Sequence, residues 1–423
     1  MTRGRVLIAP VVMASSPLSV ASGRAGRLAG LALGLILFGG LFQYVIDLKP
    51  MYLLAKAWPV LTLPLSVGAA LKVRPSYQPL VLTSLAWMLA ATAFIGIGQL
   101  GNDALGAVAS TAKIWPLTGA LGACAALTWL RPSAQDLTRA VAAVALLTFG
   151  FLAIAWLTLP PVAFEGSIET TKVFLTDPER GRRINAPMMY AIMGLLLLNR
   201  FAWSGGGGWG GVGRRILALA AILLGVVLML TIYKQRAQIA GTGVVLVLGA
   251  MLSGRRWRGP ALLSLAAGVI GLALPGWLWL QAGDAVQTLG GSLSIRQVEA
   301  TAALDFLNAE PWRWITGVGS ATRIGGVTLG DIVGTPFFFP SDLGWLGVVF
   351  EYGLVGAGLM LALHVAAIVV AGRAARSGSL IGAAVFDYAV FLLVVSPIVS
   401  VALSPGEMAT CLALGWWLGR PER

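Results

Sequence analysis

The stretch GRRILALAAILLGVVLMLTIYKQRAQIAGTGVVLVLGAMLSGRRWR, residues 213–258, decides the fold class of this chain. It holds two apolar runs, at about residues 215–232 and 237–253, with arginines at the two outer ends and very few residues between the runs. A helix that crosses a bilayer core about 30 Å thick needs roughly 20 apolar residues. The stretch therefore predicts two consecutive transmembrane helices whose arginine-bearing ends lie on the same side of the membrane.

Runs of the same kind occur along the whole chain of 423 residues, which is 57% hydrophobic and only 11% charged. This composition excludes a soluble domain of the same length, because such a domain needs a polar surface. We predict an all-α, polytopic bundle of about 12 transmembrane helices. The expected spans are residues 28–46, 51–71, 79–98, 112–130, 139–159, 186–203, 215–232, 237–253, 260–280, 343–371, 380–400 and 402–418.

The distribution of basic residues predicts the orientation of this bundle, because cytoplasmic loops are rich in Lys and Arg. With the N-terminus in the cytoplasm, the cytoplasmic segments hold 18 of the 30 basic residues but only Asp136 and Glu422 of the 17 acids. The basic residues on that side are Arg3, Arg5, Arg24, Arg27, Lys72, Arg74, Arg131, Arg139, Arg200, Arg214, Arg215, Arg255, Arg256, Arg258, Arg373, Arg376, Arg420 and Arg423. The net charge of +13 thus reflects topology, and we expect no nucleic-acid partner.

This orientation divides the chain into five parts. Residues 1–27 form a cytoplasmic tail rather than a cleaved signal peptide, because Pro10 interrupts the short apolar stretch there. Residues 28–280 hold the first nine spans, residues 281–342 form a large, helical periplasmic loop, residues 343–418 hold the last three spans, and residues 419–423 form a second cytoplasmic tail. Long ordered loops carry function more often than short ones, so the chemistry is expected on the periplasmic side.

Three positions outside the cytoplasmic segments carry candidate anion-binding arginines. Arg182 and Arg183 precede the sixth span, and Asn185 as N-cap with Pro187 in the first turn would place them at a helix N-terminus, which attracts anions. Arg236 opens the eighth span, where a guanidinium near the membrane is expected to point into a polar cavity. The alternatives are interfacial anchoring for the first two and snorkelling for the third.

The large loop and the tenth span add further polar candidates. Ser294 with Gln297 matches a capping box, so an external amphipathic helix is expected to begin there. Arg296 and Glu299 share one face of that helix, where they would pair with each other or present Arg296 to a phosphate. Asp342 lies at the start of the tenth span, as a cap or a catalytic group, and Glu351 follows about 13 Å deeper along the helix.

These motifs, in this order, resemble those of the O-antigen ligase and Wzy-type polysaccharide polymerase superfamily of integral-membrane, GT-C-like glycosyltransferases. The resemblance covers about residues 180–360. It rests on Arg-Ile-Asn-Ala-Pro at residues 183–187, Gln-Arg-Ala at 235–237, Ser-Ile-Arg at 294–296, Pro-Trp-Arg-Trp-Ile-Thr-Gly-Val-Gly at 311–319, and the segments 346–351 and 353–356.

The resemblance implies an inverting, metal-independent enzyme that uses a saccharide linked to undecaprenyl diphosphate. Arg182 or Arg183, Arg236 and Arg296 would hold the diphosphate, and Glu351 matches a carboxylate of the family motif. Where many members have a His nine residues before that Glu, this chain has Asp342, a weaker base unless its surroundings raise its pKa. A rival hypothesis places the base at Asp47 in the first external loop.

The sequence contains no Asp-X-Asp motif, and two distant cysteines with one histidine cannot form a metal cluster, so neither a metal nor another cofactor is expected. We expect a repeat-unit polymerase of the bacterial inner membrane that acts at the periplasmic face, with ligation of glycan to a lipid A core as the close alternative. A lipid-linked oligosaccharide flippase is the alternative from another class, which the external position of the charges disfavours. The expected partners are the lipid-linked oligosaccharide, membrane lipid and, where one exists, a chain-length regulator.

Overall fold

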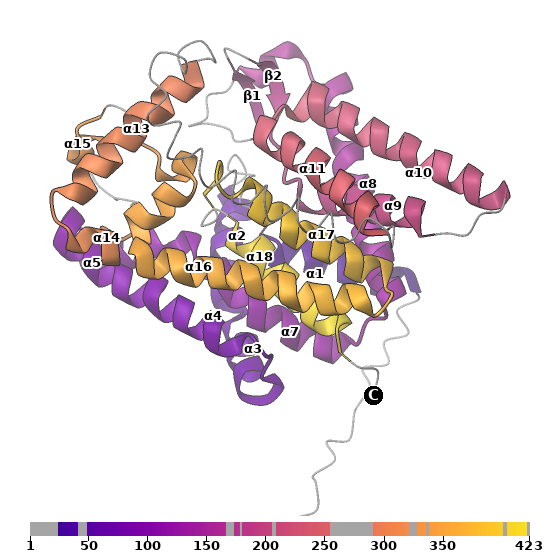
Figure 1. Ribbon diagram of the computed structural model, residues 1–423, viewed down its shortest axis with the longest axis horizontal. Helices are drawn as coiled ribbons and strands as arrows, with labels where there is room; N and C mark the ends of the chain where they lie inside the picture. Colours follow the sequence, from indigo (N-terminus) through magenta and orange to yellow (C-terminus); the bar gives the residue numbers. More distant parts are fainter. Residues whose placement is uncertain are drawn as a thin grey trace, which may run out of the picture.

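The structure is a computed structural model, and it describes residues 24–40, 49–165, 173–177, 180–204, 209–253, 291–320, 328–335, 338–400 and 404–420. Helices dominate these residues, and one short β-hairpin is the exception (Figure 1). The N-terminal half contains α1 (Arg24–Phe38), α2 (Lys49–Leu61), α3 (Leu63–Gly68), η2 (Ala69–Val73), α4 (Gln78–Leu85), η3 (Ala86–Ala91), α5 (Thr92–Leu100), α6 (Ala104–Ser110), η4 (Thr111–Lys113), η5 (Trp115–Thr118), α7 (Gly119–Leu130), α8 (Ala134–Thr158) and η6 (Pro161–Phe164).

The C-terminal half begins with the hairpin and continues with helices. Its elements are β1 (Phe174–Asp177), β2 (Gly181–Ile184), α9 (Met189–Trp203), α10 (Trp209–Leu228), η7 (Met229–Tyr233), α11 (Arg236–Ser253), α13 (Gly291–Asn308), α14 (Trp312–Thr316), α15 (Leu329–Val333), η10 (Pro340–Leu343), α16 (Trp345–Arg376), α17 (Leu380–Val395) and α18 (Pro405–Leu418).

The fold is that of an all-α membrane protein. Among the residues that the structure describes, five helices are long and apolar enough to cross a bilayer, namely Gln78–Leu100, Ala134–Thr158, Gly211–Tyr233, Arg236–Ser253 and Trp345–Arg376. Shorter apolar helices accompany them, at Ala25–Phe38, Leu63–Val73, Trp115–Leu130, Met189–Trp203 and Leu380–Val395. Helices thus occupy the described parts of the predicted spans. Residues 41–46 of the first span, 402–403 of the last and the whole of the ninth, 260–280, lie outside the described residues. Their helical nature is confirmed, whereas the number of membrane crossings stays a prediction.

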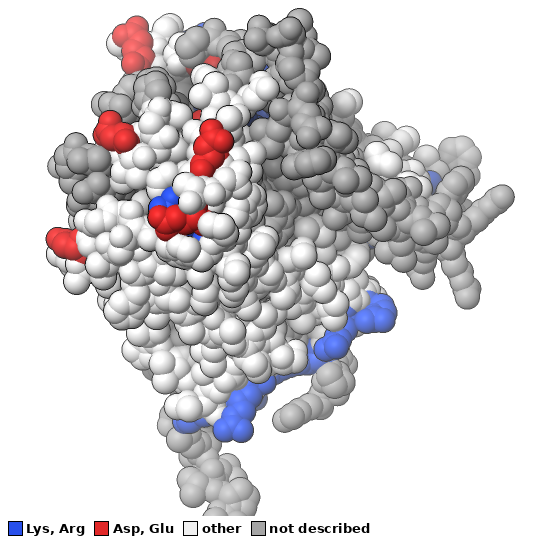
Figure 2. All heavy atoms as spheres, turned by 60° about the vertical axis from the view of Figure 1, so that its left-hand side comes forward, with Lys and Arg blue, Asp and Glu red and all other residues white. Residues whose placement is uncertain are grey.

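The outer faces of these helices are apolar. On α10, for example, Ile216, Leu217 and Leu223 are each more than 60% exposed. Large leucine and isoleucine side chains on a continuous outer surface suit contact with lipid rather than with water. Figure 2 shows one face of the molecule on which acidic side chains gather towards one end, basic side chains line the opposite edge, and uncharged residues fill the area between.

The centre of the bundle is formed by α16, α17 and α18, which pack against one another and against α7 and α9. Tyr190 of α9, Tyr352 of α16 and Tyr388 of α17 are among the largest fully buried side chains. The Tyr190 hydroxyl donates to the backbone oxygen of Leu35 at 2.7 Å, and that of Tyr388 donates to a carboxylate oxygen of Glu407 at 2.7 Å. The hydroxyls of Tyr190 and Tyr388 are therefore satisfied by neighbouring helices, as burial requires.

A buried ion pair joins three of these helices at one end of the bundle. Arg200, near the end of α9, donates to both carboxylate oxygens of Asp387 on α17, at 2.7 and 2.6 Å, and to the Ser253 hydroxyl at the end of α11, at 3.1 Å. Both charged side chains are at most 10% exposed. The pair is bidentate and buried, so removing either side chain would leave the charge of the other one desolvated and without a partner.

We expect the substitution Asp387→Asn to lower the free energy of unfolding by about 3–5 kcal/mol, because it leaves the Arg200 guanidinium buried without a counter-charge. Thermal unfolding of the purified protein in detergent measures the effect. Asp136→Asn is the matched control: its ion pair with Arg27 is 3.6 Å long and Arg27 is half-exposed, so the cost there is at most about 1 kcal/mol. Equal stabilities of the two variants would contradict a supporting role for the buried pair.

Candidate functional site

The β-hairpin carries the first two predicted arginines. Strands β1 and β2 pair antiparallel, with Leu175 opposite Arg183 and Thr176 opposite Arg182. The amide of Asn185 continues the pairing by donating to the backbone oxygen of Val173 at 2.7 Å. The prediction that these arginines stand at a helix N-terminus is therefore wrong, as is the assignment of Asn185 as N-cap: α9 begins only at Met189. Pro187 explains the difference, because the residue before a proline is pushed to extended backbone.

Arg183 is buried on one face of the hairpin. Asp177 lies diagonally across the two strands on the same face, and its carboxylate is 3.3 Å from an Nη of Arg183. The Nε of Arg183 is buried without a hydrogen-bond partner among the described residues. Burial lowers the pKa of Arg183 from its ordinary value, and the charge of Asp177 opposes this shift. A partly desolvated guanidinium with an unused donor gains most from a bound anion.

Arg182 and Lys234 meet over an aromatic surface on the other side. The Arg182 guanidinium lies 5.3 Å from the ring centre of Trp156 and 5.7 Å from that of Phe164, and the Lys234 ammonium lies 5.5 Å from the Trp156 ring. Lys234 occupies the break between η7 and α11 with a left-handed φ of 57°, which turns the chain back towards the hairpin. Two cations therefore share one tryptophan.

Lys234 and Arg180 tie this break to the hairpin. The Lys234 ammonium donates to the backbone oxygen of Arg180 at 2.8 Å, and an Nη of Arg180 donates to the backbone oxygen of Lys234 at 3.3 Å. Arg180 lies 3.9 Å from the Asp177 carboxylate, which also contacts Arg183. We call Arg180, Arg182, Arg183 and Lys234 the hairpin cluster. Its four cations face a single contacting carboxylate among the described residues, so the cluster favours a ligand with several negative charges.

Arg236 follows the cluster in sequence but is not enclosed. It is the first residue of α11, two residues after Lys234, and its side chain is exposed. The expectation that it points into a polar cavity is therefore not met. Its neighbour Gln235 donates from its side-chain amide towards the side-chain oxygen of Asn185 at 3.5 Å, which keeps the start of α11 beside the hairpin.

A second group of predicted residues meets at a break in α16. Gly353 has φ 67° and ψ −178° in the middle of this helix, so the helical hydrogen bonds stop there. The amides of Val318 and Gly319 donate to the backbone oxygens of Phe350 and Glu351, at 2.9 and 3.1 Å. A side chain at Gly317 would clash with the backbone at Gly353, so this close approach needs glycine. The motif segment 311–319 is thus bound to the motif segment around Glu351.

The Glu351 carboxylate in this group is buried and forms an ion pair with Lys113 of η4. The Lys113 ammonium also lies 5.9 Å from the ring centre of Tyr352. Reasoning from sequence did not select Lys113. The sequence nevertheless marks this residue, because Lys113 lies in a predicted apolar span, where a lysine costs free energy unless it has a partner or a function. Its partner lies 238 positions away in the chain, so sequence could not name it.

Asp342 lies in the turn η10, before α16, and is exposed. The alternative that it caps α16 is wrong, because Gly344 occupies the N-cap position with φ 55° and no side-chain cap is formed.

Near Asp342, the side chain of Glu299 of α13 is buried and accepts a hydrogen bond from the backbone amide of Phe339 at 3.0 Å. Burial raises the pKa of Glu299 and the negative charge of Asp342 raises it further, whereas the hydrogen bond from the Phe339 amide and the charge of Arg296 oppose this shift. These three side chains therefore form one electrostatic group.

The helix predicted in this segment is confirmed as α13, but it begins at Gly291, so Ser294 lies inside it rather than at its start. Figure 1 places α13 and the hairpin along the same edge of the molecule. Within the described ranges, no hydrogen bond or ion pair joins Arg296 to the hairpin cluster. The predicted diphosphate-binding arginines thus fall into two groups. Asp47, the rival base, lies outside the described residues.

The raised pKa of Glu299 predicts a pH dependence of stability. Because the folded protein binds this proton more tightly than the unfolded chain does, the stabilisation is complete below the ordinary pKa of 4.5 and is lost as pH rises through the higher folded value. We expect Glu299→Gln, which keeps an oxygen acceptor for Phe339, to flatten this loss in melting temperature measured between pH 4 and 8. Glu310→Gln, a change at a more exposed carboxylate on the same segment, is the control, and identical profiles for all three proteins would refute the assignment.

Comparisons with known proteins add no further assignment. No protein-family model matches the chain, and no curated protein matches it either. The candidate site therefore rests on the geometry of the hairpin cluster, the break in α16 and the group around Glu299.

Proposed function

We propose that this protein is a membrane-embedded glycosyltransferase that joins lipid-linked repeat units into a polysaccharide, with undecaprenyl diphosphate as the leaving group. The observation that carries the proposal is the hairpin cluster. Arg182 and Lys234 lie over the ring of Trp156. Arg180 and Arg183 contact Asp177, so the hairpin cluster gathers four positive charges with one contacting acid among the described residues. A diphosphate matches this surplus of charge, and planar guanidinium groups bind its oxygens bidentately.

The chemistry follows from that match. When the hydroxyl of an acceptor sugar attacks the anomeric carbon of the donor, the bond to the diphosphate oxygen breaks and negative charge grows on the leaving group. Cations that are already fixed and partly desolvated stabilise this charge without reorganising. The buried, incompletely hydrogen-bonded Arg183 suits this role, while Arg182 and Lys234 are held in place by the Trp156 ring.

We assign the acid–base role to Asp342. Its carboxylate is exposed beside Glu299 and Arg296, so an acceptor hydroxyl can reach it and hand over its proton. Glu351 is instead buried and paired with Lys113, and we assign it a positioning role, because it fixes the break in α16 next to residues 317–319. Arg296 would then contact donor or acceptor on the α13 side, and Arg236 would extend the hairpin cluster at the start of α11.

The proposed topology has 12 spans, both termini in the cytoplasm and the site at the periplasmic face of the bacterial inner membrane. Two observations support it. The hairpin and α13 lie along one edge of the molecule (Figure 1), and basic side chains line the edge opposite to the acidic end of the face in Figure 2. The positive-inside rule assigns such a basic edge to the cytoplasm.

We expect Arg182→Gln to reduce chain growth at least tenfold, because it removes a fixed cation from the leaving-group site. Radiolabelled lipid-linked units are chased in spheroplasts, and their chain length is read on a gel. Arg215→Gln is the matched control, since Arg215 stacks on Trp203 at 5.2 Å, much as Arg182 stacks on Trp156. Single units stranded outside the membrane support a polymerase. Units stranded inside, or equal activity of both variants, would overturn the proposal, and unattached full-length chains would indicate a ligase.

We expect Asp342→Asn to lower chain growth at least tenfold while the melting temperature stays unchanged, because the carboxylate is exposed and does not cap α16. The same assay measures the rate. Asp331→Asn provides the control at another exposed acid of the large loop, where an asparagine at N3 can still accept the Thr328 amide in the capping box of α15. An Asp342→Asn variant with wild-type activity would exclude this residue as the base.

A further inference from the structure

The turn that leads into α16 carries two exposed side chains of different character. Phe339, just before η10, is 55% exposed, and Asp342 within η10 is exposed as well. The amide of Asp342 donates to the backbone oxygen of Phe339 at 2.9 Å, and such a bond between residues i and i+3 brings the two residues close together. The turn therefore places an aromatic ring and a carboxylate within one small area of the surface.

Three contacts hold the backbone of this turn. The amide of Phe339 donates to the buried carboxylate of Glu299 at 3.0 Å, and the amide of Ser400 donates to the backbone oxygen of Ser341 at 3.0 Å. The residue before the turn, Phe338, is buried in the small apolar core beneath α13. Because the backbone is already fixed, a ligand that stacks on the exposed ring of Phe339 orders little of the protein when it binds.

Helix α13 completes the surroundings of the turn. Arg296 precedes Glu299 by three residues, so the two side chains share one face of the helix. The charges of both Arg296 and Asp342 act on the Glu299 carboxylate, which places Arg296 near the turn as well. Its guanidinium offers several N–H donors, and the Asp342 carboxylate offers acceptors. The area thus combines an apolar surface with hydrogen-bonding groups of both kinds.

This combination matches the chemistry of a sugar ring. One face of a pyranose carries mostly C–H groups, which pack on the electron-rich face of an aromatic ring, while the hydroxyl groups around its edge form hydrogen bonds with polar side chains. A hydrocarbon chain would use the Phe339 ring but would leave the Asp342 carboxylate desolvated without a partner. A saccharide uses the ring, the carboxylate and the guanidinium together.

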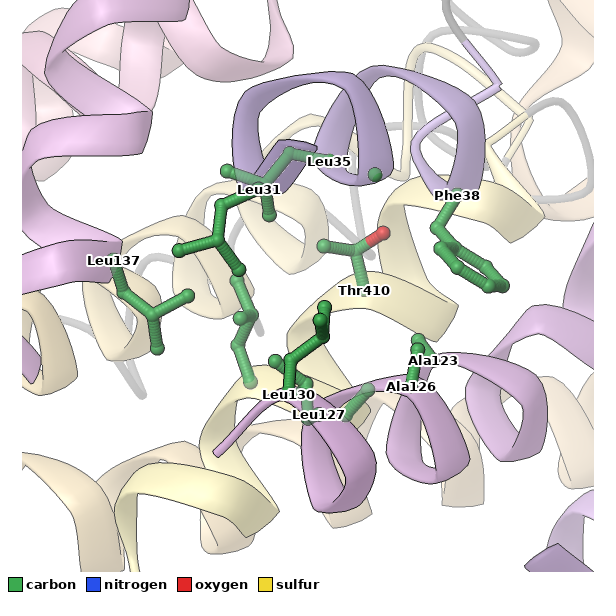
Figure 3. A pocket seen from close by; sticks show the side chains of 12 residues that line it. Leu31, Leu35, Phe38, Ala123, Ala126, Leu127, Leu130, Leu137 and Thr410 are labelled. Atoms are coloured by element: carbon green, nitrogen blue, oxygen red, sulfur yellow. The ribbon is translucent and has the colours of Figure 1, made fainter. Parts of the chain in front are cut away.

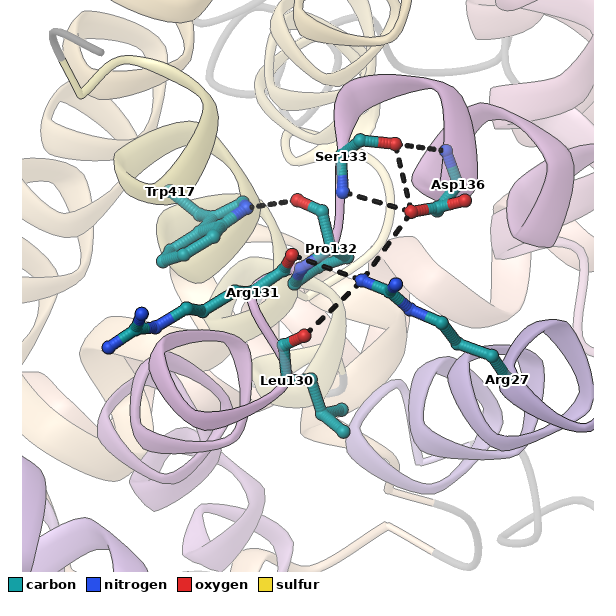
Figure 4. A network of polar contacts seen from close by, with 7 residues as sticks. All are labelled: Arg27, Leu130, Arg131, Pro132, Ser133, Asp136 and Trp417. Carbon is teal, nitrogen blue, oxygen red and sulfur yellow. Dashed lines mark hydrogen bonds and ion pairs between the residues drawn. The ribbon is translucent and has the colours of Figure 1, made fainter. Parts of the chain in front are cut away.

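Two features near α1 and α7 do not offer this chemistry. The cavity between α1, α7, α8 and α18 has a volume of about 50 Å³, which is too small for a sugar ring, and mainly apolar side chains line it (Figure 3). In the network of Figure 4, the Asp136 carboxylate accepts hydrogen bonds from Ser133 and lies 3.6 Å from Arg27, while the Trp417 indole donates to the backbone oxygen of Pro132 at 3.0 Å. These groups bond to one another and link helices.

We propose that Phe339 is the stacking platform for the acceptor sugar, whose ring lies on the aromatic face with its nucleophilic hydroxyl at Asp342 and a neighbouring hydroxyl at Arg296. The inference rests on the proposed function, because it places the acceptor beside the group that takes its proton. The platform fixes the position of the sugar and adds no acid–base chemistry, so it contributes to the affinity for the acceptor.

Acceptor binding tests the platform directly. The probe is the free repeat-unit oligosaccharide, released by mild acid from the polysaccharide of the same bacterium and titrated into the purified full-length protein. We expect Phe339→Ala to weaken its binding about fivefold and Phe339→Trp to keep it, because tryptophan also offers a flat aromatic surface. Phe339→Leu should weaken binding too, since leucine is apolar but has no ring. Phe94→Ala is the matched control, the same change at a phenylalanine of α5 that is 75% exposed.

Chain growth separates the platform from the proposed function. With the same oligosaccharide as acceptor, Phe339→Ala should raise the acceptor KM about fivefold and leave kcat nearly unchanged. If Arg182→Gln and Asp342→Asn lose chain growth while Phe339→Ala binds the oligosaccharide like the wild type, the platform is overturned and the proposed function stands. Wild-type chain growth in Arg182→Gln and Asp342→Asn overturns the proposed function itself. Full binding by Phe339→Leu, or an equal loss in Phe94→Ala, would also contradict stacking on Phe339.

Discussion

The hydrogen bonds across the break at Gly353 hold residues 311–319 to the bundle. A helix that stops inside a membrane protein leaves backbone oxygens without donors, and lipid cannot supply any. Here the amides of Val318 and Gly319 supply them to Phe350 and Glu351, and the indole of Trp87 donates to the oxygen of Tyr352 at 2.9 Å. Because these donors come from other parts of the chain, the break fixes residues 311–319 and the start of α16 relative to the N-terminal helices.

The same rule governs the charged side chains in the interior. Asp387 has Arg200, Glu351 has Lys113, and Glu407 has the hydroxyl of Tyr388. The first two pairs join helices that are distant in sequence, and the third joins the consecutive helices α17 and α18. Loss of either member of a pair leaves its partner unsatisfied. The pairs do not make the bundle stable by themselves, since burying charge is costly. They specify which helices are neighbours.

Sequence was sufficient for the helices and insufficient for the site, for a physical reason. Apolar runs and arginine placement are local properties, so the described spans were found close to their observed positions. Asn185 and Pro187 also form a local pattern, but the pairing of Asn185 with Val173 competes with the start of a helix and prevails. Lys113 could be recognised only as an unexplained charge, because its partner Glu351 becomes a neighbour only after folding. Asp342 was placed correctly before α16, yet its surroundings come from α13.

The arginines at the hairpin end of the molecule differ from those near α1 and α7 in how deeply they are buried more than in how many there are. Arg183 is buried against a hairpin, and its lowered pKa indicates that its charge is poorly solvated. A bound diphosphate would replace the missing water, so the ligand gains more there than it would from an exposed cation. Arg27 and Arg131 remain exposed and keep most of their hydration, so an anion gains less from either of them. Under the proposed function, the buried Arg183 is therefore the cation of the hairpin cluster best suited to stabilise negative charge on a leaving group.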